Sequence, residues 1–564
     1  MKSERFYLEF HGFDLKIVGR QSTLYYYLLS IDEFTSYFVT EIIKKIHKSD
    51  YFNKFECFKK KSMKLTVSMH LSYFNIMIGL LLFSFQSCDN EPLDDGDVTG
   101  ANLDTDDTAI SLENELQISD FIWQGLNEFY YWQEEMEDLA DSKKEDAKAY
   151  AQYINNNSEP KTFFESLNHP DDRFSWIQDD YLELENSLQG IFATNGVEFS
   201  LLYACENCSE VVGFVKYILK DSNAEGKNIN RGDLFNGVNG TLLNVGNYRS
   251  LLFGDELNYT LNMAKVENGS IISNGINIEL DKIENFEVNP VQINKVLNTS
   301  VGNIGYLMYN QFVASKSNDL NKIFADFKKE GINDLIIDLR YNSGGSVKNC
   351  IELASMITGQ FKDEVFSKEE WNTKLDEFLK VNYGPESLIN RFVNILSDGE
   401  GINSLQLNRL YVLTSSESAS ASELLINGLS PLIEVIQIGE RTLGKNVGSI
   451  TVYDYIDNDK TKNPDHRYAM QPIVLKIANS IGFSDYTDGL EPFIEVQEDL
   501  KNLGVLGEQE ESFLATALSL ITGTAKRNIP KAEWDRSLLI NDPLMLKRQK
   551  MIIEKNFSFP AMVN

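Results

Sequence analysis

The sequence predicts a multidomain chain of the α/β and α+β classes, with a small helical domain, a small β domain and an α/β core whose sheet is mainly parallel. Three observations support this prediction. The 564 residues exceed what one hydrophobic core accommodates. Apolar residues follow helical spacing early in the chain, where Ile118, Ile122 and Leu126 recur. From Val301 onward, strand-like and helix-like segments alternate, which is typical of a parallel sheet with crossover helices.

A short apolar segment from Tyr73 to Phe85 follows a run of basic residues and leads to Cys88. It is too short to span a membrane and has the length of a signal-peptide core. Residues 63–88 resemble a bacterial lipoprotein signal, which implies that Cys88 is lipidated and becomes the first residue of the mature chain. An ordinary secretory signal is the alternative, and both export the protein. With the anchor, we expect a protein of the bacterial cell envelope, attached to a membrane through lipid.

The chain is acidic, with a formal net charge of −32. A nucleic-acid-binding surface needs a basic stripe and none is evident, so we expect no nucleic acid partner. Residues 89–107 contain eight acidic residues and no Lys or Arg. They open a linker over residues 89–112 that we expect to be disordered. Such a linker would hold a folded body away from a membrane surface.

Changes in composition divide the remainder into four expected parts. These are a helical N-terminal domain (113–185), a small β domain (186–290), the α/β core (296–527) and a C-terminal tail (528–564). Residues 1–62 precede the signal segment, although a targeting segment must emerge first. We therefore expect this extension not to belong to the working protein, with Met63 as the natural start.

The β domain carries a hairpin signal in the sequence INRGDLFNGVNG. An Arg-Gly-Asp turn precedes Leu234 and Phe235, and Asn239 with Gly240 indicates a tight turn. This stretch resembles the signature of PDZ domains. The resemblance implies that backbone amides bind the C-terminal carboxylate of a peptide, which adds a strand to the sheet. The implied partners are proteins or peptides with free, apolar C-termini, and a small β domain of another kind is the alternative.

Three loops follow predicted strands of the core, and they carry the sequences YNSGG, TSSESASASE and RTLGKN. Because the carboxyl ends of parallel strands meet at one edge of a sheet, we expect these loops to lie together. Ser420 and Glu423 have the spacing of a capping box, in which Ser420 would only accept a backbone N–H. The alternative is that Ser420 is a nucleophile at the positive end of a helix.

Two other motifs resemble a phosphate-binding site and a zinc site, but both are incomplete, so we expect no cofactor and no metal. Residues 439–446 nearly fit a phosphate-binding P-loop, but Asn446 replaces the hydroxyl residue that binds magnesium, and a strand is expected where a P-loop needs a helix. Cys205 and Cys208 have half of a zinc-site spacing, and Cys350 alone cannot complete it. A local disulfide or two free thiols is expected there.

The segments DLRYNSGG, SASASE and GERTLGK, in this order behind a PDZ-like domain, resemble the C-terminal processing peptidases, also called tail-specific proteases. These are serine peptidases. The resemblance implies that Ser420 is the nucleophile and that Lys445 is the general base. Family members often carry a glutamine four residues after the lysine, thought to orient it. Here that position is Ser449. Either Ser449 takes the role more weakly, or another residue takes it, or the difference marks lost activity.

The residues available in the chain also support a lysine as the general base, independently of the family resemblance. Only His169 and His466 remain in the mature chain, one in the helical domain and one in a polar loop. A lysine can accept the proton if burial disfavours its ammonium form and lowers its pKa. Oxyanion donors would be the amides of Ala421, Gly344 and Gly345. The expected function is an envelope serine endopeptidase acting through an acyl-enzyme, and the alternative is an inactive relative that binds peptides as a scaffold.

Overall fold

The computed structural model describes residues 6–9, 16–19, 106–524, 540 and 550–554. The chain divides into two compact units, Met1–Ala101 and Asn102–Asn564. In the first unit, strands β1 (Phe6–Glu9) and β2 (Lys16–Gly19) form an antiparallel hairpin. The predicted signal segment 63–88, including Cys88, lies outside the described residues. In the described ranges, no helix combines the length and the apolar character that a membrane span requires.

The second unit begins with a helical region that contains the helices α4 (Asp106–Phe129), α5 (Ala147–Asn155), α6 (Pro160–Ser166) and α7 (Tyr181–Leu188). Helix α4 buries Ile118, Ile122 and Leu126, as their spacing predicted. The prediction of disorder up to residue 112 was wrong at its end, because residues 106–112 belong to α4. Strand β3 (Trp176–Gln178) pairs with a strand of the core, so this region is built onto the core.

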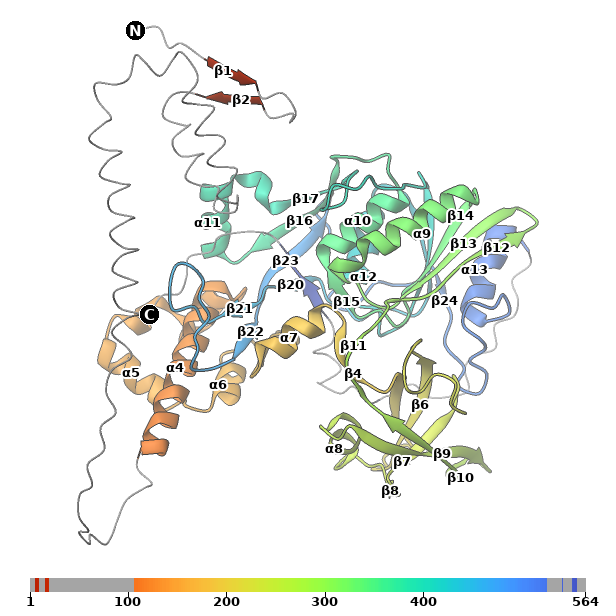
Figure 1. Cartoon of the computed structure of the whole chain (residues 1–564), viewed down its shortest axis with the longest axis horizontal. Helices are drawn as coiled ribbons and strands as arrows, with labels where there is room; N and C mark the ends of the chain where they lie inside the picture. The colour runs from red at the N-terminus through yellow and green to blue at the C-terminus, as the bar shows by residue number, and fades with distance from the viewer. Residues whose placement is uncertain (1–5, 10–15, 20–105, 525–539, 541–549, 555–564) are drawn as a thin grey trace, which may run out of the picture. The chain divides into compact units, whose positions relative to one another are not determined.

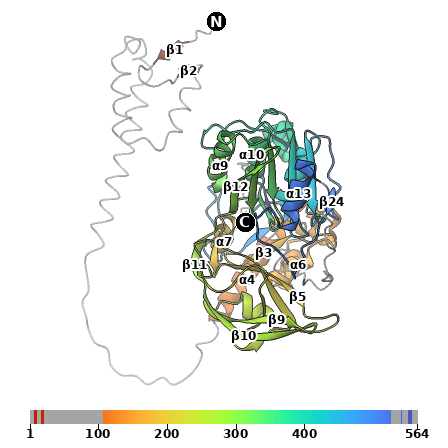
Figure 2. The same cartoon turned by 90° about the vertical axis from the view of Figure 1, so that its right-hand side faces the viewer.

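The β domain follows, with a sheet in the order β10-β9-β7-β6-β5 and antiparallel neighbours. Figure 1 shows this sheet together with helix α8 (Tyr248–Phe253), and Figure 2 labels its strands β5, β9 and β10. Strands β4 (Ile191–Thr194) and β11 (Ile283–Glu287) pair with each other in a separate two-stranded sheet. The sheet comprises the strands β5 (Val197–Tyr203), β6 (Val211–Ile218), β7 (Leu234–Val238), β8 (Thr241–Leu242), β9 (Asn258–Glu267) and β10 (Ser270–Asp281).

The main sheet of the core confirms the predicted mainly parallel arrangement. Its order is β12-β13-β14-β18-β19-β24, and every pair except β12 with β13 is parallel. The sheet comprises β12 (Val291–Thr299), β13 (Gly302–Tyr309), β14 (Asp334–Asp338), β18 (Arg409–Thr414), β19 (Glu434–Gly439) and β24 (Ile494–Glu495).

Helices cover both faces of the main sheet, because alternate strand residues point to opposite sides. Leu335 and Ile337 of β14 belong to one core cluster with residues of α9, α10 and α12, whereas Ile336 belongs to another with residues of α13. Figure 1 shows α9, α10 and α12 grouped together and α13 apart from them. The helices are α9 (Ser317–Lys329), α10 (Val347–Ile357), α12 (Ala421–Leu429) and α13 (Ser512–Thr522).

A second sheet of the core, in the order β15-β25-β20-β23-β16-β17, was not predicted. It is mixed, and its short strands come from distant parts of the chain. They are β15 (Gly344–Ser346), β16 (Val365–Trp371), β17 (Ile389–Arg391), β20 (Val447–Ser449), β23 (Ile473–Asn479) and β25 (Lys550–Ile552). Helix α11 (Thr373–Tyr383) follows β16, and β21 (Val452–Tyr453) and β22 (Ala469–Gln471) form a small sheet with β3.

The boundary predicted between a core ending at residue 527 and a tail over 528–564 was wrong. Strand β25 lies between β15 and β20, and Met551 is fully buried. Ser346 Oγ also donates a hydrogen bond to Glu554, at 2.7 Å. The end of the chain therefore completes a core sheet beside the glycine turn, a long-range pairing that local sequence does not reveal.

Candidate active site

The loops after β14, β18 and β19 meet at the carboxyl edge of the main sheet, as predicted. The Ala419 amide donates to the carbonyl of Asn342 at 3.1 Å. The Leu443 amide donates to the carbonyl of Ser418 at 3.0 Å. Backbone hydrogen bonds therefore join the serine-rich loop to both of its neighbours.

Most serines of the serine-rich loop are structural. The hydroxyls of Ser415, Ser418 and Ser422 all donate to backbone carbonyls of residues 339–342. Ser418 and Ser422 do so at 2.8 and 3.0 Å. These bonds satisfy buried hydroxyls and attach the loop to the end of β14. Ser420 is the remaining buried serine of the loop, and it sits in a different conformation.

Ser420 precedes the first residue of α12 and has φ 63° and ψ −114°. A positive φ is costly for a residue with a Cβ atom, and such strain collects at functional sites. The Ser420 side chain is fully buried. The strand-to-helix turn that the sequence suggested is therefore present, and it holds this serine in a strained backbone conformation at a helix N-terminus.

Glu423 connects the Ser420 turn with the lysine loop. Its Oε2 accepts the amide N–H of Ser420 at 2.7 Å and that of Lys445 at 2.8 Å. Its Oε1 accepts the Gly444 amide at 2.7 Å and the Thr442 hydroxyl at 2.6 Å. Burial raises the pKa of this carboxyl, although these four donors oppose the shift. The capping-box spacing predicted that Ser420 would accept a backbone N–H, and the capping box of Ser420 and Glu423 is present. The link from Glu423 to the lysine loop has no local sequence signal.

Lys445 is nearly inaccessible, with 2% of its surface exposed. Its Nζ lies 4.8 Å from the centre of the Phe174 ring. The neighbouring Arg173 donates to the carbonyl of Gly444 at 2.6 Å. The helical region thus covers the lysine loop, a contribution that the sequence did not indicate. Strand β20 follows this loop, so the helix that a P-loop requires is absent at this described position.

The glycine turn has two residues with left-handed φ, 105° at Gly344 and 137° at Gly345. A Cβ atom at Gly345 would lie 2.0 Å from the carbonyl oxygen of Phe312, so only glycine fits there. The Gly344 amide already donates to Asn342 Oδ1 at 2.8 Å. The Gly344 N–H therefore already has an acceptor, and it could donate to an oxyanion only if that hydrogen bond broke. Ala421, another of the expected oxyanion donors, is the first residue of α12.

Ser449, the position that resembles the family glutamine, lies on β20. Its Oγ is 3.0 Å from Gln471 Oε1 and 3.4 Å from the carbonyl oxygen of Met551. A glutamine from β22 thus meets this serine in space, 22 residues later in the chain. An orienting role of Ser449 toward Lys445 remains a prediction.

The two histidines are occupied elsewhere. Nε2 of His466 lies 3.0 Å from Asp454, and its Nδ1 accepts the amide of Tyr468 at 3.1 Å. His169 stacks on Trp132, with ring centres 5.6 Å apart. Both ring nitrogens of His466 are used within its own hairpin region, which argues against it as the base for Ser420.

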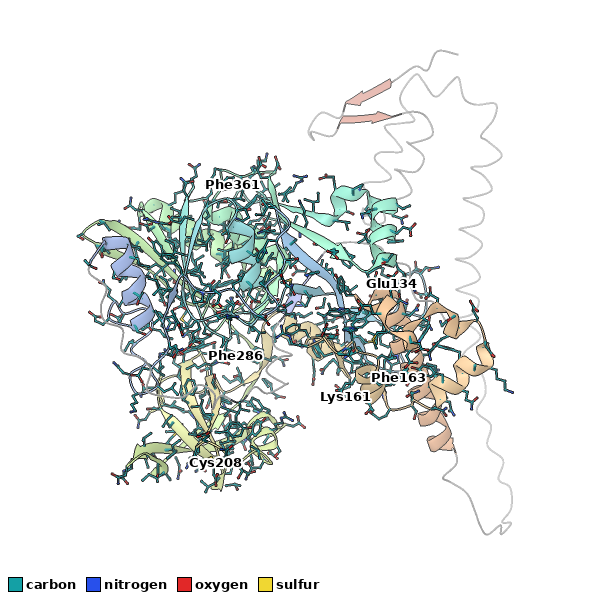
Figure 3. All side chains as sticks on the ribbon, turned by 180° about the vertical axis from the view of Figure 1, so that it is seen from behind. Glu134, Lys161, Phe163, Cys208, Phe286 and Phe361 are labelled. Carbon is teal, nitrogen blue, oxygen red and sulfur yellow. A yellow bond between two sulfur atoms is a disulfide. The ribbon has the colours of Figure 1, made fainter. Side chains whose placement is uncertain are left out.

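None of the described cysteines lies in these three loops. Cys205 and Cys208 form a disulfide between β5 and β6, one of the two alternatives expected, and Figure 3 labels Cys208 in the β domain. Glu210 lies near both sulfur atoms. Cys350 is free and fully buried, and burial raises the pKa of its thiol.

The β domain contacts the serine-rich loop through Glu417. Ser200 of β5 donates to one carboxylate oxygen of Glu417, and Lys216 of β6 donates to the other, each at 2.7 Å. Glu417 precedes Ser420 by three residues in the chain. The Arg-Gly-Asp turn is similarly attached, because Arg231 donates to Tyr341 Oη at 2.6 Å. Two of the three site loops therefore contact the β domain.

Comparison with known proteins agrees with these observations. The profile of Peptidase family S41 matches residues 303–469, and that of the Peptidase S41 N-terminal domain matches residues 117–176. A crystal structure of a candidate S41 protease from Bacteroides fragilis is 23% identical, covers 72% of this chain and 97% of that one, and has a TM-score of 0.55. This likeness shows a shared fold.

Curated relatives match over shorter stretches. A "Probable CtpA-like serine protease" of Staphylococcus epidermidis is 22% identical over 44% of this chain and 45% of its own length. A "Carboxyl-terminal-processing protease" of Picosynechococcus is 25% identical over 26% of this chain and 30% of its own length. The chain thus spans less than half the length of these curated relatives. The chain is therefore similar to peptidase family S41 over residues 117–176 and 303–469.

Proposed function

We propose that this chain is a serine endopeptidase in which Ser420 is the nucleophile and Lys445 is the general base. One observation carries the proposal. The backbone N–H groups of Ser420 and Lys445 both donate to the same carboxylate oxygen, Glu423 Oε2. Both side chains are buried, and Ser420 has a strained backbone conformation at a helix N-terminus. Burial penalises the ammonium form of the lysine, and the neutral amine can accept a proton. Ser–Lys pairs are known alternatives to the serine–histidine arrangement.

In the proposed reaction, Ser420 Oγ attacks the carbonyl carbon of the scissile peptide bond while Lys445 Nζ takes the hydroxyl proton. The oxyanion is stabilised by the amides of Ala421 and Gly345. The lysine then returns the proton to the leaving amine, the C–N bond breaks, and an acyl-enzyme remains. A water molecule that gives its proton to Lys445 hydrolyses this ester and frees Ser420.

The proposed substrates are proteins captured by free, apolar C-terminal tails at the β domain. The sheet and the single helix α8 of this domain support strand addition as the mode of capture. The contacts of Ser200 and Lys216 with Glu417 support a short connection from this domain to the serine-rich loop.

The first test is labelling with a fluorophosphonate probe, which reacts with an activated serine. Wild-type protein is expected to be labelled, and Ser420→Ala should lose the label, because the hydroxyl that becomes phosphonylated is gone. Ser418→Ala serves as the matched control, since the hydroxyl of Ser418 donates to the Leu339 carbonyl. Labelling that persists in Ser420→Ala would refute the assignment, and an unlabelled wild type would favour the scaffold alternative.

The proposed location is the cell envelope, with a lipid anchor at Cys88. Metabolic labelling with a fatty acid analogue is expected to mark a chain that starts at Met63, and Cys88→Ser should abolish the mark. Cys350→Ser is the control, because the Cys350 thiol is buried in the core. Equal labelling of wild type and Cys88→Ser would contradict the anchor.

A further inference from the structure

A turn of the helical region that begins at Asp172 reaches the lysine loop of the core. Asp172 Oδ1 accepts the amide N–H groups of Phe174 and Ser175, at 2.8 and 2.9 Å. Its Oδ2 accepts the hydroxyl of Tyr130, the residue after α4, at 2.8 Å. Ser175 Oγ accepts the amide of Ile473 in β23, also at 2.8 Å. The turn is therefore held by the helical region on one side and by the core on the other.

The ring of Phe174 forms an apolar cover over the lysine loop. Phe174 is 8% exposed and shares a core cluster with Val447 and Ile473, and the partly buried Leu443 packs against the same cluster. Leu443 and Val447 stand two residues before and two residues after Lys445. The Lys445 Nζ lies 4.8 Å from the centre of the ring. The ring therefore takes the place of water on one side of the amine.

Arg173 attaches this turn to two loops of the core. One of its terminal nitrogens donates to the carbonyl oxygens of Gly444 and Thr487, at 2.6 and 3.0 Å. Its guanidinium carbon lies 4.7 Å from the centre of the Phe174 ring. A second cation thus lies beside the ring that contacts Lys445, and a nearby like charge disfavours an ammonium ion.

These contacts have opposing effects on the protonation of Lys445. Burial and the charge of Arg173 disfavour the ammonium form, whereas the face of an aromatic ring attracts a cation. The penalty for burying a charge is larger than a cation–π attraction, and Lys445 is only 2% exposed. The balance of the contacts from the helical region therefore favours the neutral amine.

Other ionisable groups lie near the lysine loop. Glu423 of α12 accepts the Lys445 amide at 2.8 Å, and a negative charge there favours the ammonium form. Tyr486, in the loop after β23, stays neutral, because burial and the charge of Glu423 raise the pKa of its hydroxyl. Arg441 of the lysine loop is exposed and pairs with Glu491. None of these groups belongs to the helical region, so changes in that region leave them in place.

We propose that Arg173 and Phe174 are positioning residues for Lys445, through which the helical region keeps the amine neutral and able to accept a proton. This role rests on the proposed function, because it takes Lys445 as the general base. Both residues act through the lysine and not on the substrate. The helical region is then a part of the active site.

The test measures the rate of fluorophosphonate labelling of the full-length protein as a function of pH. Lys445 must be neutral to take the Ser420 proton, so the rate in the parent rises with pH, and the midpoint reports the pKa of the lysine. Phe174→Ala admits water beside the amine, which should move the midpoint up by about one pH unit and lower the rate about tenfold below both midpoints. Above both midpoints, the two proteins should label at the same rate.

Two further variants separate this role from packing. Phe174→Leu keeps an apolar side chain over the amine and should retain the midpoint of the parent. Phe163→Ala is the matched control, because it removes a buried phenylalanine of the same helical region, labelled in Figure 3, that belongs to a different core cluster. It should lower the thermal stability and leave the midpoint unchanged.

Arg173→Met keeps the test decisive if Phe174→Ala does not fold, since Arg173 is exposed. This change removes the like charge and the hydrogen bonds to Gly444 and Thr487, so the midpoint should rise here too. Arg173→Lys keeps the charge and should stay closer to the parent. An unchanged midpoint in Arg173→Met would then overturn the proposal.

Three outcomes with a folded Phe174→Ala would also overturn it. These are an unchanged midpoint, an equal shift in Phe174→Leu or Phe163→Ala, and a loss of labelling that is the same at every pH. Failure of the proposed function looks different, because the parent itself would then remain unlabelled. A labelled parent whose variants keep its midpoint would refute only the role of Arg173 and Phe174.

Discussion

Lys445→Arg should be as inactive as Ser420→Ala, each losing about 10⁴-fold in kcat/KM, which corresponds to roughly 5.5 kcal/mol of barrier. Arginine keeps the positive charge, but its guanidinium stays protonated and cannot accept the serine proton. Lys445→Met, which keeps the apolar length beside Phe174, should be equally inactive. The measurement is cleavage of a fluorogenic peptide, with thermal unfolding as a check on folding.

The double variant of Ser420→Ala with Lys445→Met should be no worse than either single variant. Residues that act as one unit give effects that do not add. His169→Ala is the control, because the His169 ring stacks on Trp132. A histidine site would instead be indicated if His466→Ala abolished cleavage while Lys445→Met stayed within about tenfold of wild type, roughly 1.4 kcal/mol.

Glu423→Gln is expected to lower the rate of fluorophosphonate labelling about 10³-fold, or roughly 4 kcal/mol, although the two side chains have nearly the same shape. The Glu423 carboxylate accepts four hydrogen bonds, two on each oxygen. Glutamine has only one oxygen, so its amide NH₂ would face backbone N–H donors in either orientation. A buried donor that loses its acceptor costs about 1–3 kcal/mol.

The loss identifies Glu423 as a positioning residue, since its carboxylate holds the backbones of Ser420 and Lys445. Its effect should therefore appear in the labelling rate at temperatures where the variant is still folded, as judged by circular dichroism. Glu434→Gln at the exposed start of β19 is the matched control and should label like wild type. A Glu423→Gln protein that is folded and labels at the wild-type rate would contradict this role.

Much of the fold followed from local pattern. The spacing of Ile118, Ile122 and Leu126 predicted a helix, which is α4. The alternation of strand-like and helix-like segments from Val301 onward predicted a parallel sheet, in which β14 and β18 are neighbours. The three loops could be placed together because parallel strands end at one edge. These features depend on side-chain periodicity and chain direction, which can be recognised in short stretches of sequence.

What the sequence by itself determined was therefore the α/β core, the meeting of its three loops and the position of Ser420 at a strand-to-helix turn. Only the tertiary structure decided which groups hold that turn. Glu423 meets the lysine loop, Phe174 covers Lys445, and β25 completes a sheet beside the glycine turn. The physical reason is that each of these contacts joins segments far apart in the chain. Their partners are selected by packing and by satisfaction of buried hydrogen bonds, which no local spacing records.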